Sequence, residues 1–265
     1  MKFKILISAL ALASMTAMGA AVHAQQKEIR IGTETGYAPF EYKNAQGELV
    51  GFDIDVGNAI CEKLQAKCVW VDQPFDSLIP GLQARKFDLI HASITRTEAR
   101  AKVINFTEDL YAIPTQLVAK KGSDLLPSVE SLKGKKVGVL QGSVQEAYAR
   151  KAWGKEGVTI VSYQDQEQTY GDLPANRLDA ILSEKPNAIA GFLSKPEGKD
   201  YDFVGEPIDN DPLVANQIAM GVRKADTQLK ADVDQAILQL RQEGVIEKLA
   251  EKYFQPGELT LFKAQ

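Results

Sequence analysis

Residues 51–93 read GFDIDVGNAICEKLQAKCVWVDQPFDSLIPGLQARKFDLIHAS, and their apolar residues follow two different periods. Helical spacing runs from residue 51 to the mid-sixties, and a second helical stretch lies between the apolar runs at 68–71 and 87–93. Residues 28–33 add an earlier strand, which makes the order strand, helix, strand, helix, strand. This alternation is typical of an α/β fold with a mainly parallel sheet covered by helices.

The alternation begins again after residues 111–115, which predicts a second lobe. A late strand at 218–222 and a helical region at 226–253, interrupted at Gly244, can belong to either lobe. The strands predicted for the second lobe are 116–119, 136–140, 159–163 and 178–183.

The composition is that of a globular protein, with 45% hydrophobic and 25% charged residues. There are 31 Lys and Arg residues against 35 Asp and Glu residues, a formal net charge of −4. An acidic chain without a basic stripe argues against a nucleic-acid-binding protein.

The first 24 residues have the order of a secretory signal peptide. A basic start, Met1-Lys-Phe-Lys4, precedes an apolar stretch at 5–13, and Val22-His23-Ala24 offers small residues for cleavage after Ala24. The apolar run is shorter than the roughly 20 residues that a membrane span needs. The sequence therefore predicts an exported chain.

Export determines what the two cysteines, Cys61 and Cys68, do. In an oxidising compartment an even pair predicts a disulfide, and its short loop is worth about 2–3 kcal/mol. A metal site is not expected, because His91 is the only histidine after the signal peptide. His91 lies in an apolar strand, which favours a structural or pocket-edge role over that of a catalytic base.

Polar residues collect at the ends of four predicted strands. In open parallel sheets ligands bind beyond the carboxyl ends of the strands, so these segments are candidates for a site. The four segments are 33–37, 92–95 with Arg100 after it, 140–145, and 182–184.

Arg100 and Glu184 match the two charged ends of an amino-acid zwitterion. A guanidinium can hold a carboxylate through two hydrogen bonds, and a carboxylate at the end of an apolar strand needs a cation or several donors. A purely structural alternative stays open, because Thr95-x-x-Glu98 and Ser143-x-x-Glu146 are also capping boxes.

Four stretches together resemble the periplasmic amino-acid-binding proteins that serve as solute receptors of ABC importers. The resemblance is to the histidine-binding and lysine/arginine/ornithine-binding members, and it covers nearly the whole mature chain. The stretches are YAPFEYKNAQGELVGFDIDVGNAICEKLQAKC (37–68), SLIPGLQARKFD (77–88), SLKGKKVGVLQGSVQEAY (131–148) and EKLAEKYF (247–254).

The resemblance implies a two-lobe type II periplasmic binding protein fold that closes on its ligand. Lobe 1 would comprise residues 27–111 and 216–265, and lobe 2 residues 115–210, with a hinge near 112–115 and 210–216. A monomer, a membrane permease as partner and no cofactor are implied in the same way.

The resemblance also implies a role for each residue of the site. Arg100 would bind the α-carboxylate with the backbone N–H groups of Thr95 and Val144. The α-ammonium would be held by Ser93, Thr95 and Glu184. The side-chain pocket would be lined by Glu34, Tyr37, Phe75, Ala92, Leu140, Ser143 and Gln145.

Four positions depart from the pattern of these relatives. Glu184 and Glu34 stand where aspartate is usual, and Ala92 and Val144 replace hydroxyl residues. Glu34 with the aromatic residues Phe75 and Tyr37 still favours a cationic side chain, such as that of arginine, lysine, ornithine or histidine. Two alternatives remain: a periplasmic enzyme resembling cyclohexadienyl dehydratase, and a ligand-sensing module.

Overall fold

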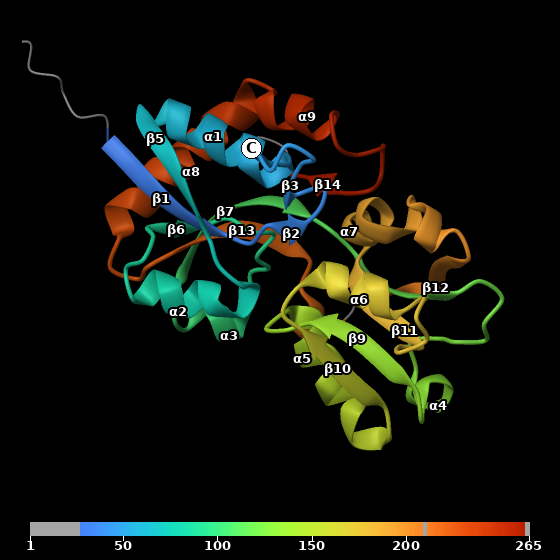
Figure 1. Ribbon diagram of the computed structural model, residues 1–265. Coiled ribbons are helices and arrows are strands. Elements are labelled where there is room, and N and C mark those ends of the chain that lie inside the picture. The colour runs from blue at the N-terminus through green and yellow to red at the C-terminus, as the bar shows by residue number, and fades with distance from the viewer. Residues whose placement is uncertain (1–26, 209–210, 263–265) are drawn as a thin grey trace, which may run out of the picture.

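The computed structural model of the protein describes residues 27–208 and 211–262, which form two α/β lobes (Figure 1). The expected signal peptide lies outside these residues. Within them, no helix combines the length and apolar character that crossing a bilayer requires.

The elements alternate along much of the chain, as the sequence predicts. The strands are β1 (Lys27–Thr33), β2 (Gly36–Tyr37), β3 (Glu41–Lys43), β4 (Leu49–Val50), β5 (Ala66–Asp72), β6 (Leu89–Ile90), β7 (Asn105–Ala112), β8 (Thr115–Lys120), β9 (Lys136–Leu140), β10 (Thr159–Tyr163), β11 (Ala180–Glu184), β12 (Tyr201–Ile208), β13 (Gln217–Val222) and β14 (Thr260–Leu261). The helices are α1 (Phe52–Lys63), α2 (Leu78–Gln83), α3 (Glu98–Ala101), α4 (Val129–Leu132), α5 (Val144–Ala152), α6 (Gln166–Asp172), α7 (Lys185–Ala188), α8 (Thr227–Gln242) and α9 (Val245–Ala250).

The first lobe is built on a six-stranded sheet in the order β14-β7-β13-β6-β1-β5. Strand β1 pairs in parallel with β5 and β6, whereas β13 runs antiparallel to both β6 and β7. The late strand and the C-terminal helices α8 and α9 therefore belong to this lobe. A small antiparallel sheet of β2, β3 and β4 also lies here and faces the second lobe (Figure 1).

The second lobe has a five-stranded sheet in the order β10-β9-β11-β8-β12. Strand β9 pairs in parallel with β10 and β11, and β8 is antiparallel to β11 and β12. The chain enters this lobe between β7 and β8 and leaves it between β12 and β13.

Both sheets are mixed, which corrects the expectation of mainly parallel sheets. The parallel strands are those joined by crossover helices, as expected. Strands β8 and β13 each follow a passage between the lobes and pair antiparallel, because a strand that arrives from the other lobe needs no crossover helix. Strand β14, after α9, is also antiparallel to its neighbour β7.

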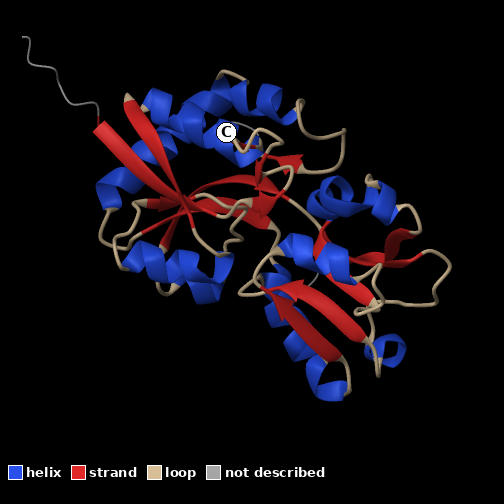
Figure 2. Cartoon of the chain, viewed as in Figure 1, coloured by secondary structure: helices blue, strands red, loops and turns tan. Residues whose placement is uncertain are grey.

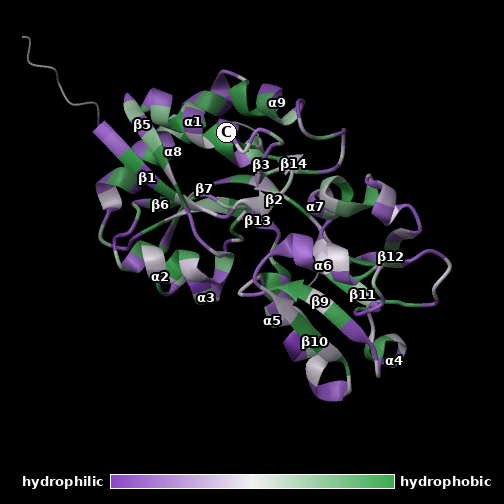
Figure 3. Ribbon diagram, viewed as in Figure 1, coloured by the Kyte–Doolittle hydropathy of each residue, from purple (hydrophilic) through white to green (hydrophobic). Residues whose placement is uncertain are grey.

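Helices cover both faces of each sheet, so each lobe has two apolar layers (Figure 2). In the second lobe Leu117 faces α4 and α5, while its neighbour Val118 faces α6 and α7. The hydropathy colouring shows the same arrangement, with apolar strands between helices whose outer faces are polar (Figure 3). This alternation along a strand buries both faces of the sheet.

Helix α1 begins at a position that only glycine can occupy. Gly51 has a φ of 135°, and a Cβ atom there would lie 2.1 Å from the carbonyl oxygen of Phe40. Asp53 and Asp55 lie in the first turn of the helix and Lys63 in the last, which suits the helix dipole.

The disulfide between Cys61 and Cys68 is present and joins the last turn of α1 to β5. The prediction made from the even cysteine count is therefore confirmed. The bond fastens the edge strand β5 to the helix that covers it.

Replacing both cysteines by serine should lower the free energy of unfolding by about 2–3 kcal/mol, because the unfolded chain loses a closed loop. Urea denaturation followed by circular dichroism measures this difference, with the oxidised wild type as reference. An unchanged denaturation midpoint would contradict the assignment of a stabilising role to this bond.

Candidate functional site

The structure brings all the predicted site residues around one enclosed space between the lobes. Side chains fill nearly all of it: only about 10 Å³ is open to the centre of a water-sized sphere, far below the roughly 300–1,000 Å³ of ordinary small-molecule pockets. The lobes are thus closed on each other. The lining residues are Glu34, Tyr37, Phe75, Ala92, Ser93, Thr95, Arg100, Leu140, Ser143, Val144, Gln145 and Glu184.

Arg100 carries the positive charge of the cavity and comes from the first lobe. Its guanidinium donates to the carbonyl oxygens of Thr95, at 2.8 Å, and Gly142, at 3.0 Å. It also lies over the ring of Phe75, 5.3 Å from the centroid. Burial lowers the pKa of Arg100 to about 10, so it stays charged at neutral pH. A guanidinium has five N–H donors, and those left over can bind an anion.

Glu184 lies at the end of β11 and faces the cavity from the second lobe. Its carboxylate is buried and accepts a hydrogen bond of 2.8 Å from the hydroxyl of Tyr37. Burial raises the pKa of Glu184 to about 8, although the Tyr37 hydrogen bond and the charge of Arg100 act in the opposite direction. A cation bound beside this carboxylate would stabilise its ionised form.

The N-terminus of α5, in the second lobe, could hold an anion in addition to Arg100 of the first lobe. The Ser143 hydroxyl accepts from the N–H of Glu146 at 3.0 Å, which confirms the capping residue predicted there. The Glu146 carboxylate instead reaches back to the N–H of Gly142. The first N–H groups of a helix have no acceptor within it, and Val144 is the first residue of α5.

The other predicted capping box is wrong. Helix α3 starts after Thr97, whose hydroxyl accepts from the N–H of Arg100, and it has only four residues. Thr95 instead forms a backbone bridge with Ile218 and lines the cavity. Threonine occurs at both 95 and 97, and the spacing to Glu98 pointed to Thr95, whereas Thr97 is the residue that caps the helix.

Ser93 is held in an unusual backbone conformation by a buried aspartate that the sequence analysis missed. Its φ is 44°, and its N–H donates to Asp53 at 2.8 Å. The hydroxyl of Tyr111 lies 3.0 Å from Ser93 Oγ and donates to the other Asp53 oxygen at 2.7 Å. This network fixes the hydroxyl of Ser93 at the cavity wall. An acidic residue in the first turn of a helix is common, so no sequence signal distinguished Asp53.

His91 has the structural role that was expected of it. It is fully buried, with its Nδ1 3.3 Å from Asp53, and its ring stacks on Trp70. Burial lowers the pKa of His91, so the ring is neutral. It does not line the cavity.

Glu34 gives one end of the cavity an acidic character. Its side chain is 6% exposed, and no hydrogen bond reaches its carboxyl group from residues 27–208 or 211–262. Burial raises the pKa of this group well above its usual value, and the charges of Asp165, Glu184 and Asp72 act in the same direction. Ala92 and Leu140 also line the cavity, and both are buried apolar residues.

Direct contacts across the lobe boundary close the cavity. The amide of Gln141 donates to Asp76 at 2.7 Å, and the amide of Asn187 donates to the carbonyl oxygen of Ala38 at 2.7 Å. These residues are far apart in sequence, so no local pattern could have paired them.

The similarity of the chain to known proteins identifies its family. Residues 29–256 match the family of bacterial extracellular solute-binding proteins, family 3. The chain belongs to this family. It is 47% identical over 245 residues to the histidine-binding periplasmic protein of Escherichia coli K12, covering 92% of this chain and 93% of that protein. The family resemblance inferred from the sequence is thereby confirmed.

Two further similarities extend the comparison. The lysine/arginine/ornithine-binding periplasmic protein of Escherichia coli K12 is 46% identical over 243 residues, with 92% of this chain and 94% of that protein covered. The solved structure of an ancestral arginine-binding protein bound to arginine has a TM-score of 0.81 and 33% identity. That match covers 87% of this chain and 99% of the other, so it confirms the two-lobe fold.

Changing Asp53 to asparagine should lower the free energy of unfolding by about 1–3 kcal/mol, because one of the two buried donors loses its acceptor. Chemical denaturation measures the loss. The control is Asp55→Asn on the same helix, where a partly exposed carboxylate pairs with Lys252. A loss no larger than in the control would show that the Asp53 network does not support Ser93.

Proposed function

We propose that the protein is a periplasmic receptor that binds a basic L-amino acid between its lobes and delivers it to an ABC importer permease. The observation that carries this proposal is the pair of opposite charges, Arg100 and Glu184, that face one closed cavity from different lobes. Such a pair can bind both the carboxylate and the ammonium of an amino acid, and so replace the water that these groups lose on burial.

The carboxylate end of the ligand would bind at Arg100. The free N–H groups of the guanidinium and those at the first turn of α5 converge on the same cavity. A carboxylate there would accept charge-assisted hydrogen bonds, with the helix dipole adding to the attraction. Thr95 and Val144 would contribute backbone N–H groups.

The ammonium end would bind at Glu184, with the oxygens of Ser93 and Thr95 completing its hydrogen bonds. An ammonium group has three donors and no acceptor. A carboxylate and two hydroxyl groups supply three acceptors around it, which would offset the loss of water.

The side chain of the ligand would lie toward Glu34, between the aromatic rings of Tyr37 and Phe75. An unpartnered buried carboxyl group next to aromatic faces suits a positively charged side chain. Arginine, lysine, ornithine and histidine are the candidates. Leu140, Ser143, Gln145 and Ala92 would form the remaining wall.

The closed cavity requires that the lobes open before a ligand can enter. We assign residues 27–111 and 216–265 to the first lobe and 115–210 to the second, with the hinge near 112–115 and 210–216. Binding that closes the lobes is a hinge motion. The export signal at 1–24, cleaved after Ala24, would place the receptor in the periplasm, where it would act as a monomer.

A non-catalytic role accounts for the ionisable groups of the cavity. Each charged group of the ligand would be held by one of Arg100, Glu184 and Glu34. His91 is fully buried and does not line the cavity. Binding thus uses the groups that a dehydratase would need as its acid and base. Incubation with prephenate or arogenate tests the enzymatic alternative, and turnover would contradict the proposal.

Replacing Arg100 by alanine should weaken binding of the preferred amino acid by at least about 30-fold, since a buried carboxylate would lose its charged partner. A thermal-shift screen of the mature protein against the common amino acids, ornithine and citrulline identifies that ligand. Calorimetry then measures its dissociation constant in the variant.

The control for this substitution is Arg150→Ala, which removes an arginine that is 54% exposed on α5. It should leave the dissociation constant unchanged. Unaltered affinity in a folded Arg100→Ala variant would overturn the proposed site.

Binding should release protons at pH 6. Glu184 has a pKa of about 8 without ligand, and an ammonium beside it lowers that pKa. The closed protein without ligand thus holds more protons than the complex, so its affinity should rise with pH up to about 8 and then level off. Calorimetry in buffers of different ionisation enthalpy counts the protons. Proton uptake on binding would contradict this assignment.

A further inference from the structure

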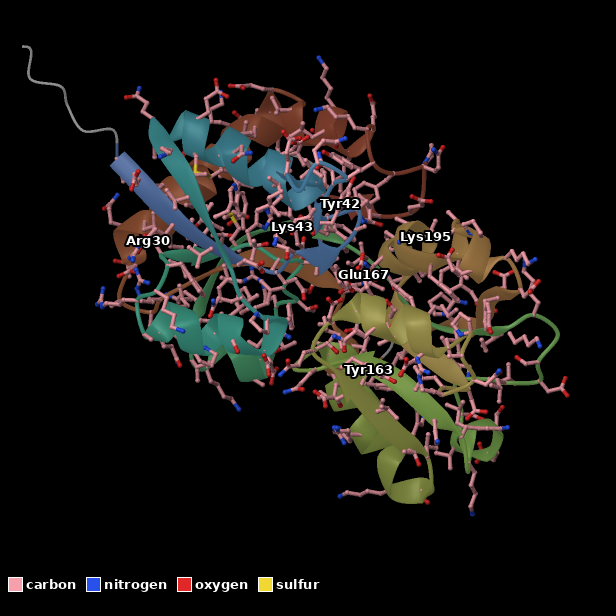
Figure 4. All side chains as sticks on the ribbon, in the orientation of Figure 1. Arg30, Tyr42, Lys43, Tyr163, Glu167 and Lys195 are labelled. Atoms are coloured by element: carbon pink, nitrogen blue, oxygen red, sulfur yellow. A yellow bond between two sulfur atoms is a disulfide. The ribbon has the colours of Figure 1, made fainter. Side chains whose placement is uncertain are left out.

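Asp165 brings a carboxylate of the second lobe against the first lobe, next to Glu34. It lies two residues beyond Tyr163, the last residue of β10, and caps the N-terminus of α6. A Cβ atom at Gly36, two residues beyond Glu34, would lie 2.9 Å from Asp165 Oδ1. Figure 1 shows the contact as the approach of α6 to β2, and Figure 4 places Glu167 of α6 on the side that faces Tyr42 and Lys43.

The Asp165 carboxylate has no cationic partner within the described part of the chain. One oxygen accepts a hydrogen bond of 2.7 Å from the N–H of Glu167. By contrast, Asp72, another carboxylate near Glu34, pairs with Lys43 at 3.2 Å. After burial, Asp165 is the largest influence that raises the pKa of Glu34.

We propose that Asp165 is a specificity residue that makes the closed cleft selective for a positively charged side chain. This inference rests on the proposed function and adds a residue to it. Asp165 does not line the cavity. It therefore acts on the ligand through the electrostatic potential at Glu34, without touching the ligand.

Glu34 and Asp165 lie on opposite lobes, so the charge of the ligand's side chain affects how readily the two lobes close. In the open form Asp165 moves away from Glu34, and their repulsion is small. Closure brings the two carboxyl groups together at a buried site, where their charges repel or Glu34 must take up a proton, and either costs free energy unless a cation lies there. A cationic side chain removes that cost, whereas a neutral one does not. The closed state is therefore populated more fully with a basic ligand.

Asp165→Asn tests the inference without disturbing the helix, because asparagine caps an N-terminus as well as aspartate does. The dissociation constants of arginine, lysine and ornithine should rise about 3- to 10-fold, as expected for a lost charge at short range in a partly screened site. Those of glutamine and citrulline, which carry no side-chain charge, should stay the same or fall. The ratio of neutral to basic dissociation constants is the quantity to compare.

The matched control is Asp202→Asn. It makes the same charge change in the same lobe, on β12, at the opposite edge of the sheet from β10. It should leave every dissociation constant unchanged. If Asp165→Asn does not fold, Asp165→Ser keeps a capping hydroxyl and removes the charge in the same way.

The outcomes separate this inference from the function on which it rests. Equal changes for basic and neutral ligands, no change at all, or the same effect in Asp202→Asn would overturn the role of Asp165 alone. A wild-type protein that binds only neutral amino acids would overturn both the ligand class and the inference. Selective loss of basic ligands in Asp165→Asn supports it.

Discussion

Two ionisable groups of opposite sign, Arg100 and Glu184, face one cavity from different lobes and determine how the rest of the site works. Arg100 is supported by two carbonyl oxygens and an aromatic ring, and Glu184 by one tyrosine hydroxyl. Neither set of neighbours neutralises its charge, and charge that leaves water without a partner is costly. A zwitterion would supply both partners at once, and only when the lobes are together. In the proposed receptor, closure and binding are therefore one event.

The fold serves this arrangement because the parallel strands of both lobes end at the cleft. Glu184 comes directly from the end of β11, and Leu140 from the end of β9. Where a strand end does not place a group, a buried network does so: Asp53 holds Ser93 at a φ of 44°, which an isolated serine would rarely adopt. The site thus depends on core residues that never touch the cavity, and α1 is as much a part of it as the lining loops.

The sequence predicted the elements and the paired charges better than it predicted how the strands pair. Apolar periodicity distinguishes helix from strand, but it does not contain the direction in which two strands run, so β8 and β13 were not recognised as antiparallel. The threonine pair at 95 and 97 illustrates a second limit, because either could have capped the helix. Asp165 follows a predicted strand, so the rule about strand ends could have found it. Asp53 could not have been found, since its role exists only once α1 packs under Ser93.

The acidic end of the cavity also explains how the departures from the relatives' pattern fit together. Ala92 and Val144 remove hydroxyl groups that would hydrogen-bond a ligand, and this leaves recognition to fewer, charged partners. Glu34 and Glu184 are each one methylene longer than aspartate, so their carboxylates reach further into the narrow space between the lobes. Hydrogen-bonding hydroxyl groups discriminate by geometry, whereas closely spaced carboxylates discriminate by charge. With Asp165 in its proposed role, selection would depend more on the charge of the side chain than on its shape, which favours a receptor for several basic amino acids over one for a single shape.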